Sequence, residues 1–258
     1  MNDTGGPRVV VKSSVAQAAN FAAELFRSIV CDAIDRTGSC SVALAGGTTP
    51  HALYHLLAFE SAVSDLPWNA IDFFFGDERD VPLDHAESNF GMAQRTLMDN
   101  VPIIPSRVHP MRADAPDLDA AAAEYEKTVR KLVPAGDTGL PRFNLILLGM
   151  GGDGHTASLY PGTDALAEKE KLVTTNYVPV LGRTRMTITY PLINAAEVII
   201  LLVTGKDKAD VVASLLHQDQ SRKAGIPAGL VEPTNGWLSL ILDAAAASKT
   251  DLTVDNDQ

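Results

Sequence analysis

The stretch FNLILLGMGGDGHTASLYP, residues 143–161, does most to decide the fold. Its first half is an apolar run without polar alternation, which is typical of a strand buried on both faces of a parallel sheet. The run stops at a glycine-rich turn, where the backbone can approach a ligand closely and present N–H groups to an anion. Asp153 and His155 lie on this turn. An imidazole there is placed to transfer protons near neutral pH.

Two other segments repeat this design of an apolar strand followed by a polar, glycine-bearing turn. They are AGGTTP at residues 45–50 and GDERD at residues 76–80. Because ligands of open α/β sheets bind outside the carboxyl ends of the strands, three such turns predict one composite site at that edge.

The order of apolar runs and helical patterns predicts an α/β fold. Strands are expected at residues 9–12, 40–45, 71–75, 143–148, 186–190, 197–203 and 237–242. Helices are expected from Ser13 or Ser14 to Gly38, from Thr49-Pro50 onward, and at 88–98, 117–132, 206–217 and 243–248. This alternation indicates a doubly wound, mostly parallel, Rossmann-like sheet with helices on both faces. One domain is expected over residues 1–258, with frayed tails at about 1–7 and 250–258.

The charge and composition of the chain exclude several classes of partner. A net charge of -11 disfavours nucleic acid and anionic membranes, and an anionic substrate would need a local basic pocket. The N-terminus lacks the pattern of a signal peptide, and no apolar run is long enough to span a bilayer. Cys31 and Cys40 are interpreted as reduced core residues, which favours a cytoplasmic protein.

Each of the three turns could also have a purely structural role. Residues 149–154 match Gly-x-Gly-x-x-Gly, but no strand ending in an acid follows about twenty residues later, which disfavours a dinucleotide site. Asp153 could cap the next helix, with or without a functional role. The turn at 46–50 has the context of a phosphate cradle, although an ordinary capped helix start would look similar. Arg79 could grip a phosphate, or belong to a solvated loop of ion pairs.

Further cations and histidines are candidates for the site. Arg183, Arg185, Lys206 and Lys208 are the other cations expected near the cleft. His51 and His55 are four residues apart on a helix, but Ala52 stands where His-Glu-x-x-His has its glutamate. The sequence therefore predicts no metal site. It also contains no Gly-x-Ser-x-Gly nucleophile elbow.

Taken together and in order, the motifs resemble the 6-phosphogluconolactonase family, within the glucosamine-6-phosphate isomerase superfamily. The matching pieces are residues 45–50, 75–82, 88–89, 148–161, 185–189, 204–209 and 227–228. The related isomerases and deaminases have a glutamate five residues after the histidine, and this chain has Tyr160 there. The alternatives that remain are an isomerase or deaminase acting on a sugar phosphate, and a sugar-phosphate sensor without activity.

The resemblance implies an enzyme of the oxidative pentose phosphate pathway, a hydrolase that opens 6-phospho-D-glucono-1,5-lactone without metal or other cofactor. It also makes a monomer plausible. In the mechanism expected from the residue types, His155 is the base, and either Asp77 or Asp153 orients it. Gly151 and Gly152 are candidate oxyanion donors. The phosphate is expected on residues of two of the turns and on two further cations: Gly46, Gly47, Thr48, Thr49, Arg79, Arg185 (or Arg183 in its place) and Lys208.

Overall fold

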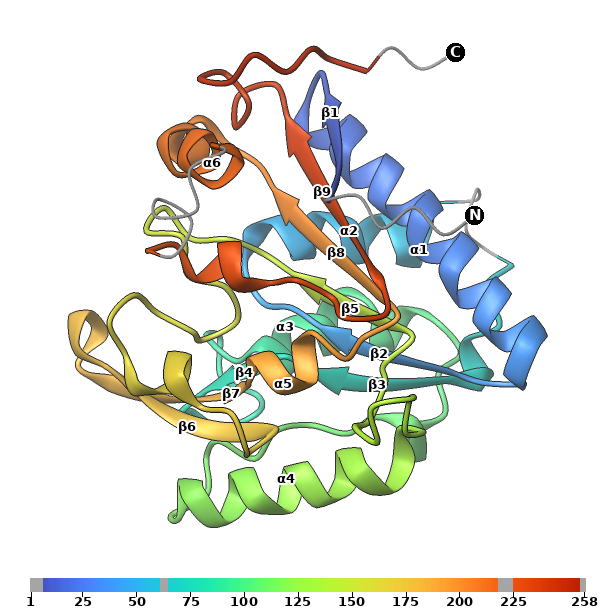
Figure 1. The fold of residues 1–258 in the computed structure, drawn as a ribbon. Coiled ribbons are helices and arrows are strands. Elements are labelled where there is room, and N and C mark those ends of the chain that lie inside the picture. Colours follow the sequence, from blue (N-terminus) through green and yellow to red (C-terminus); the bar gives the residue numbers. More distant parts are fainter. Residues whose placement is uncertain (1–6, 61–64, 218–224, 256–258) are drawn as a thin grey trace.

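A six-stranded parallel sheet forms the centre of the molecule (Figure 1). The structure is a computed structural model, which describes residues 7–60, 65–217 and 225–255. Across the sheet the strands follow the order β1 (Arg8–Lys12), β9 (Trp237–Asp243), β8 (Val198–Val203), β5 (Leu145–Leu148), β2 (Cys40–Leu44) and β3 (Ile71–Phe75). Every residue of β2, β5 and β8 is buried, as expected for strands covered on both faces. The predicted doubly wound, mostly parallel fold is confirmed.

Helices cover both faces of the sheet. The α-helices are α1 (Val15–Thr37), α2 (Thr48–Phe59), α3 (Asn89–Thr96), α4 (Leu118–Leu132), α5 (Tyr190–Ile193) and α6 (Ala209–Leu216). Phe74 and Phe75 are neighbours on β3, so their side chains point to opposite faces. The ring of Phe75 contacts Phe90 of α3, whereas Phe74 contacts Tyr125 of α4. Helices α1, α2 and α3 are in contact in that order, so they share one face, and α4 covers the other.

Short 3-10 helices connect these elements. They are η2 (Trp68–Ala70), η3 (Met98–Asn100), η4 (Pro105–Arg107), η5 (Asp164–Ala167), η6 (Pro179–Leu181), η7 (Lys206–Lys208) and η8 (Pro227–Leu230). The expected ends of α1 are confirmed. The Ser14 hydroxyl accepts a hydrogen bond from the Gln17 N–H, and Gly38 ends the helix with a φ of 81°.

A second, antiparallel sheet was not predicted. It consists of β4 (Asp77–Arg79), β7 (Arg183–Ile188) and β6 (Val173–Val178), and it lies beside the carboxyl end of β3, next to α4 (Figure 1). The strand predicted at 186–190 exists over residues 186–188 as part of β7, but its expected place in the parallel sheet was wrong, and Tyr190 already begins α5. Strand β6 escaped prediction because Thr174, Thr175 and Asn176 interrupt its apolar pattern.

The segment after β9 returns to β1 at the edge of the sheet. The helix predicted at 243–248 is a series of turns, because the carboxylate of Asp243 accepts the N–H groups of Gly205 and Ala246 and directs the chain away. The expected frayed tails lie partly outside the described residues, which begin at 7 and stop at 255. At Asp255 the tail is held on β1, where it exchanges two hydrogen bonds with Val11.

Both cysteines have free thiols, as expected. Cys40 is buried, and burial raises the pKa of its thiol to about 12. Cys31 is only partly buried, so its assignment to the core holds in part. In the described part of the chain, no helix combines the length and the apolar character that crossing a bilayer requires.

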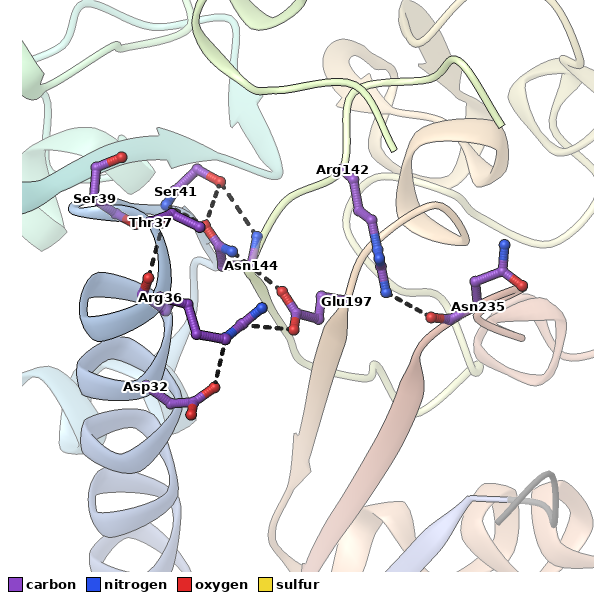
Figure 2. Close-up of polar contacts among 10 residues, drawn as sticks. Asp32, Arg36, Thr37, Ser39, Ser41, Arg142, Asn144, Glu197 and Asn235 are labelled. Carbon is purple, nitrogen blue, oxygen red and sulfur yellow. Dashed lines mark hydrogen bonds and ion pairs between the residues drawn. The ribbon is translucent and has the colours of Figure 1, made fainter. Parts of the chain in front are cut away.

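A polar cluster joins the amino ends of three central strands to α1 (Figure 2). The N–H of Ser41 donates to Oδ1 of Asn144 over 2.9 Å, and Nδ2 of Asn144 donates to Glu197 over 3.2 Å. Arg36 of α1 forms ion pairs with Glu197 and Asp32. The cluster therefore pairs a backbone donor of β2 with side chains that precede β5 and β8.

Replacing Asn144 by alanine should destabilise the fold. The change leaves the N–H of Ser41, a residue only 5% exposed, without its acceptor. A buried unsatisfied donor costs about 1–3 kcal/mol, so the free energy of unfolding in urea should fall by that amount. Asp32→Ala is the control, because its side chain is 68% exposed and its removal should change the value by less than about 0.5 kcal/mol. Equal losses for both variants would contradict the role of Asn144.

Candidate active site

A cavity of about 260 Å³ opens at the carboxyl ends of the parallel strands. It is formed by the segments that follow β2, β3, β5 and β8, as expected for a composite site of this fold. The sequence-predicted residues that line it are Gly46, Gly47, Thr48, Thr49, Asp77, Arg79, Gly151, His155 and Lys208. Gly152, Asp153 and Arg185 lie beside the cavity rather than on its lining.

The start of α2 presents an anion-binding surface to the cavity. Gly47 is the N-cap and has no side chain, so the first N–H groups of the helix, on Thr48 and Thr49, are left without a cap. The helix dipole adds positive potential at the same place. A Cβ on Gly46 would lie 1.7 Å from Oδ1 of Asn89, so only glycine allows this loop to pack against α3.

The side chains of β4 alternate, so its charged residues point to opposite faces of the strand. Asp77 and Arg79 line the cavity, whereas Glu78 points the opposite way and is completely buried. Burial raises the pKa of the Glu78 carboxyl, and hydrogen bonds from Ser88 and from three backbone N–H groups, among them that of Asn89, oppose this rise. Glu78 therefore holds α3 against β4 and takes no part in the cavity.

Asp77 is held by neighbours other than the histidine. Its Oδ1 accepts a hydrogen bond from Nδ2 of Asn89 over 2.9 Å, and its Oδ2 accepts one from Oγ of Ser158 over 2.6 Å. The side chain is thus fixed at the cavity wall with both oxygens engaged. The sequence left open whether Asp77 or Asp153 orients His155. Since both oxygens of Asp77 bind other partners, Asp77 is not the carboxylate paired with His155.

Asp153 is the partner of His155. Its Oδ1 lies 2.6 Å from Nδ1 of the imidazole and 3.1 Å from the His155 backbone nitrogen. Partial burial acts to raise the pKa of Asp153, but the His155 N–H and the imidazole outweigh this effect and lower it. An ionised carboxylate can only accept, so Nδ1 carries the proton and Nε2 is the free basic nitrogen of the neutral ring.

The glycine turn leaves space for the His155 imidazole, but Gly151 does not offer the free N–H that was expected of it. A Cβ on Gly151 would lie 2.2 Å from Nδ1 of His155, so the imidazole can rest there only over a glycine. The N–H of Gly151 already donates to the carbonyl of His155 over 2.9 Å, so it is not free to bind an oxyanion. No described residue accepts a hydrogen bond from the N–H of Gly152, which leaves that group as the candidate donor.

Two arginines face each other across the antiparallel sheet. Arg79 of β4 and Arg185 of β7 are directly paired in the register, and like charges in this position repel. Within the described part of the chain, Nε and Nη1 of Arg185 are buried without a hydrogen-bond partner. Burial and the charge of Arg79 lower the pKa of Arg185. An anion between the two guanidinium groups would satisfy both.

The remaining predicted cations have different surroundings. Arg183 forms ion pairs with Asp80 and Glu87, at 2.9 and 3.0 Å, so it is Arg185 that is available to a ligand. Lys208 lines the cavity, and its ammonium group lies 2.8 Å from Asp207. Lys206 is exposed and does not line the cavity.

Sequence reasoning missed three residues of this region. Thr204 follows β8 and its hydroxyl lies 2.9 Å from that of Thr49, so the rule of polar residues at strand ends would have found it. Ser158 holds Asp77, and the ring of Tyr160 stacks on His155. The sequence marked Tyr160 only as a departure from the isomerases and did not mark Ser158, because both contacts depend on how the turn folds back.

The described residues contain no group of three or more His, Cys, Asp or Glu side chains arranged to hold a metal ion. His51 and His55, which the sequence disfavours as a metal pair, lie exposed on α2, where they line a separate groove with Phe59 and residues of α3.

Comparisons with known proteins identify relatives of similar sequence and fold. A protein named 6-phosphogluconolactonase from Streptomyces coelicolor is 38% identical over 258 residues, covering 96% of each chain. One of the same name from Synechocystis is 38% identical over 85% of this chain and 91% of its own. The solved structure of 6-phosphogluconolactonase from Trypanosoma brucei superimposes with a TM-score of 0.83 at 29% identity, covering 94% of this chain and 98% of that one.

The family model described as glucosamine-6-phosphate isomerases/6-phosphogluconolactonase matches residues 13–240. This range includes all the residues that form the cavity. With its fold, its site and these relatives in agreement, the chain belongs to the family of glucosamine-6-phosphate isomerases and 6-phosphogluconolactonases.

Proposed function

We propose that this protein hydrolyses 6-phospho-D-glucono-1,5-lactone to 6-phospho-D-gluconate, in the oxidative pentose phosphate pathway. The relatives named 6-phosphogluconolactonase support this activity. The observation that carries it is the pair of His155 and Asp153, 2.6 Å apart at a cavity lined by cations and free N–H groups. Such a site combines a base with an anion-binding surface, as a phosphorylated lactone requires.

The phosphate group binds where positive potential is concentrated. Arg79 and Arg185 provide a pair of guanidinium groups that can each contact phosphate oxygens in a bidentate manner. The N–H groups at the start of α2 and the ammonium of Lys208 lie on the cavity that Arg79 lines, and Arg185 lies beside it. Binding of the phosphate replaces the repulsion between the two arginines by attraction, which favours an anion at this place.

Hydrolysis uses His155 first as a base and then as an acid. Nε2 takes a proton from a water molecule, whose oxygen forms a bond to C1 of the lactone. The carbonyl oxygen gains negative charge, which the N–H of Gly152 is placed to stabilise. The bond between C1 and the ring oxygen then breaks, and the imidazolium returns its proton to that oxygen. Asp153 keeps Nδ1 protonated and stabilises the imidazolium, as the acid of a catalytic triad does.

The activity can be tested directly at neutral pH, where the spontaneous reaction is slow. The lactone is generated in situ by oxidation of glucose 6-phosphate, and its disappearance is followed with and without protein. A rate above background that is proportional to protein concentration is expected. Folded protein that gives no such rate, but releases ammonia from glucosamine 6-phosphate, would identify the deaminase alternative instead.

We further propose a cytoplasmic monomer without nucleic-acid partners. A net charge of -11 supports the absence of nucleic-acid binding, and two free thiols are compatible with a reducing compartment. Light scattering coupled to size exclusion should return the mass of one chain, 27.4 kDa. A mass of twice that value would contradict the proposal of a monomer.

A further inference from the structure

The ring of Tyr160 lies flat on the imidazole of His155. The two ring centroids are 4.0 Å apart and the planes differ by 17°. The His155 side chain is 27% exposed, and the Tyr160 ring covers one face of its imidazole. The mechanism proposed above does not use Tyr160.

A chain of hydrogen bonds from the antiparallel sheet holds Tyr160 in place. Its carbonyl accepts hydrogen bonds from the N–H and the hydroxyl of Thr163, at 3.2 and 2.7 Å. The Thr163 hydroxyl in turn accepts one from Nδ2 of Asn176, a buried residue of β6. Asn176 also donates to the carbonyl of Ser158 over 2.7 Å. The segment that carries the ring is therefore tied to a strand outside the catalytic turn.

The chain segment that links His155 to Tyr160 also has an unusual backbone conformation. Ala157 has a φ of 48°, in the left-handed region that residues with a Cβ rarely adopt. Such strain persists only where the surrounding structure holds it, and it concentrates at functional sites. Here the strained residue lies between His155 and Tyr160, where the chain turns back and the two rings come to stack.

Two different contacts thus restrain the imidazole. Asp153 holds Nδ1 within the plane of the ring, and Tyr160 covers one face and limits rotation of the ring. The negative face of an aromatic ring also favours a cation placed over it, and His155 becomes an imidazolium when it takes its proton. The charged groups of Arg79, Arg185 and Asp77 also lie near Tyr160. Because a substitution at residue 160 leaves these groups in place, its effect reports on the Tyr160 ring.

We propose that Tyr160 is a positioning residue, whose aromatic ring keeps the His155 imidazole in the orientation that proton transfer requires. This inference rests on the proposed lactonase function. The ring is the effective group, because within the described residues the Tyr160 hydroxyl forms no hydrogen bond with the protein. Phenylalanine should therefore replace tyrosine, whereas leucine should not.

The test compares Tyr160→Phe with Tyr160→Leu. Tyr160→Leu should lower kcat by about 10- to 100-fold with little change in KM, because a small misplacement of a catalytic group costs this much. Tyr160→Phe should keep kcat within about threefold of the unchanged protein, since it retains the stacked face. A kcat for Tyr160→Leu equal to that of the unchanged protein, or equal losses in both variants, would overturn the proposal.

Nuclear magnetic resonance tests the same contact without turnover. The ring current of a stacked neighbour shifts the carbon-bound imidazole protons of His155 upfield, and a His155→Gln sample assigns these signals. The shift should be present in the unchanged protein and in Tyr160→Phe, and absent in Tyr160→Leu. An unchanged protein without the shift would overturn the proposal even if Tyr160→Leu failed to fold. Because this readout needs no substrate, a failure of the stacking is distinguishable from a failure of the proposed function.

Discussion

His155→Ala is expected to lower kcat for lactone hydrolysis by about 10²- to 10⁴-fold, the usual contribution of a general acid–base group. The imidazole is paired with Asp153 and lines the cavity, and no second histidine among the described residues lines it. KM should change little, because the base acts on water rather than on the phosphate. The measurement is steady-state kinetics of lactone loss, with the spontaneous rate subtracted.

His55→Ala is the matched control for this experiment. His55 is exposed on α2, outside the cavity, and its ring contacts Phe59. Its removal should leave kcat within about twofold, as for surface substitutions away from a site. If folded His155→Ala protein turned over lactone as fast as His55→Ala, His155 would not be the base.

Arg185→Met should weaken substrate binding and still leave the fold at least as stable. Hydrogen bonds to charged groups contribute about 1.5–3 kcal/mol, so KM should rise roughly 10- to 150-fold. In the absence of substrate, the same change removes a guanidinium whose Nε and Nη1 are buried without partners and which faces Arg79. The free energy of unfolding should therefore stay the same or increase, in contrast to most changes at half-buried positions.

Arg183→Met provides the control on the same strand. Arg183 forms ion pairs with Asp80 and Glu87, which occupy its guanidinium group, so the KM of this variant should stay within about threefold of that of the unchanged protein. Inorganic phosphate should compete with the lactone in the unchanged protein and in Arg183→Met, and much less in Arg185→Met. An unchanged KM in Arg185→Met, together with unchanged competition, would remove Arg185 from the phosphate site.

The parallel sheet was predictable because its strands are marked in the sequence itself. A strand buried on both faces is expected to be apolar; β5 and β8 have this pattern without interruption, and β2 departs from it only at Ser41. Strands β4 and β6 have no such mark. Asp77–Arg79 is a charged run and Val173–Val178 contains three polar residues, because the smaller sheet buries polar contacts such as that of Asn176.

The same distinction applies to the site. The sequence by itself determined that three polar turns follow buried strands, and parallel strands bring such turns to one edge. Only the tertiary structure decided that Asp153 rather than Asp77 pairs with His155, and that Arg185 rather than Arg183 is available to an anion. The reason is physical: strand positions follow from the burial of local apolar runs, whereas the direction of each polar side chain depends on partners supplied by distant segments of the chain.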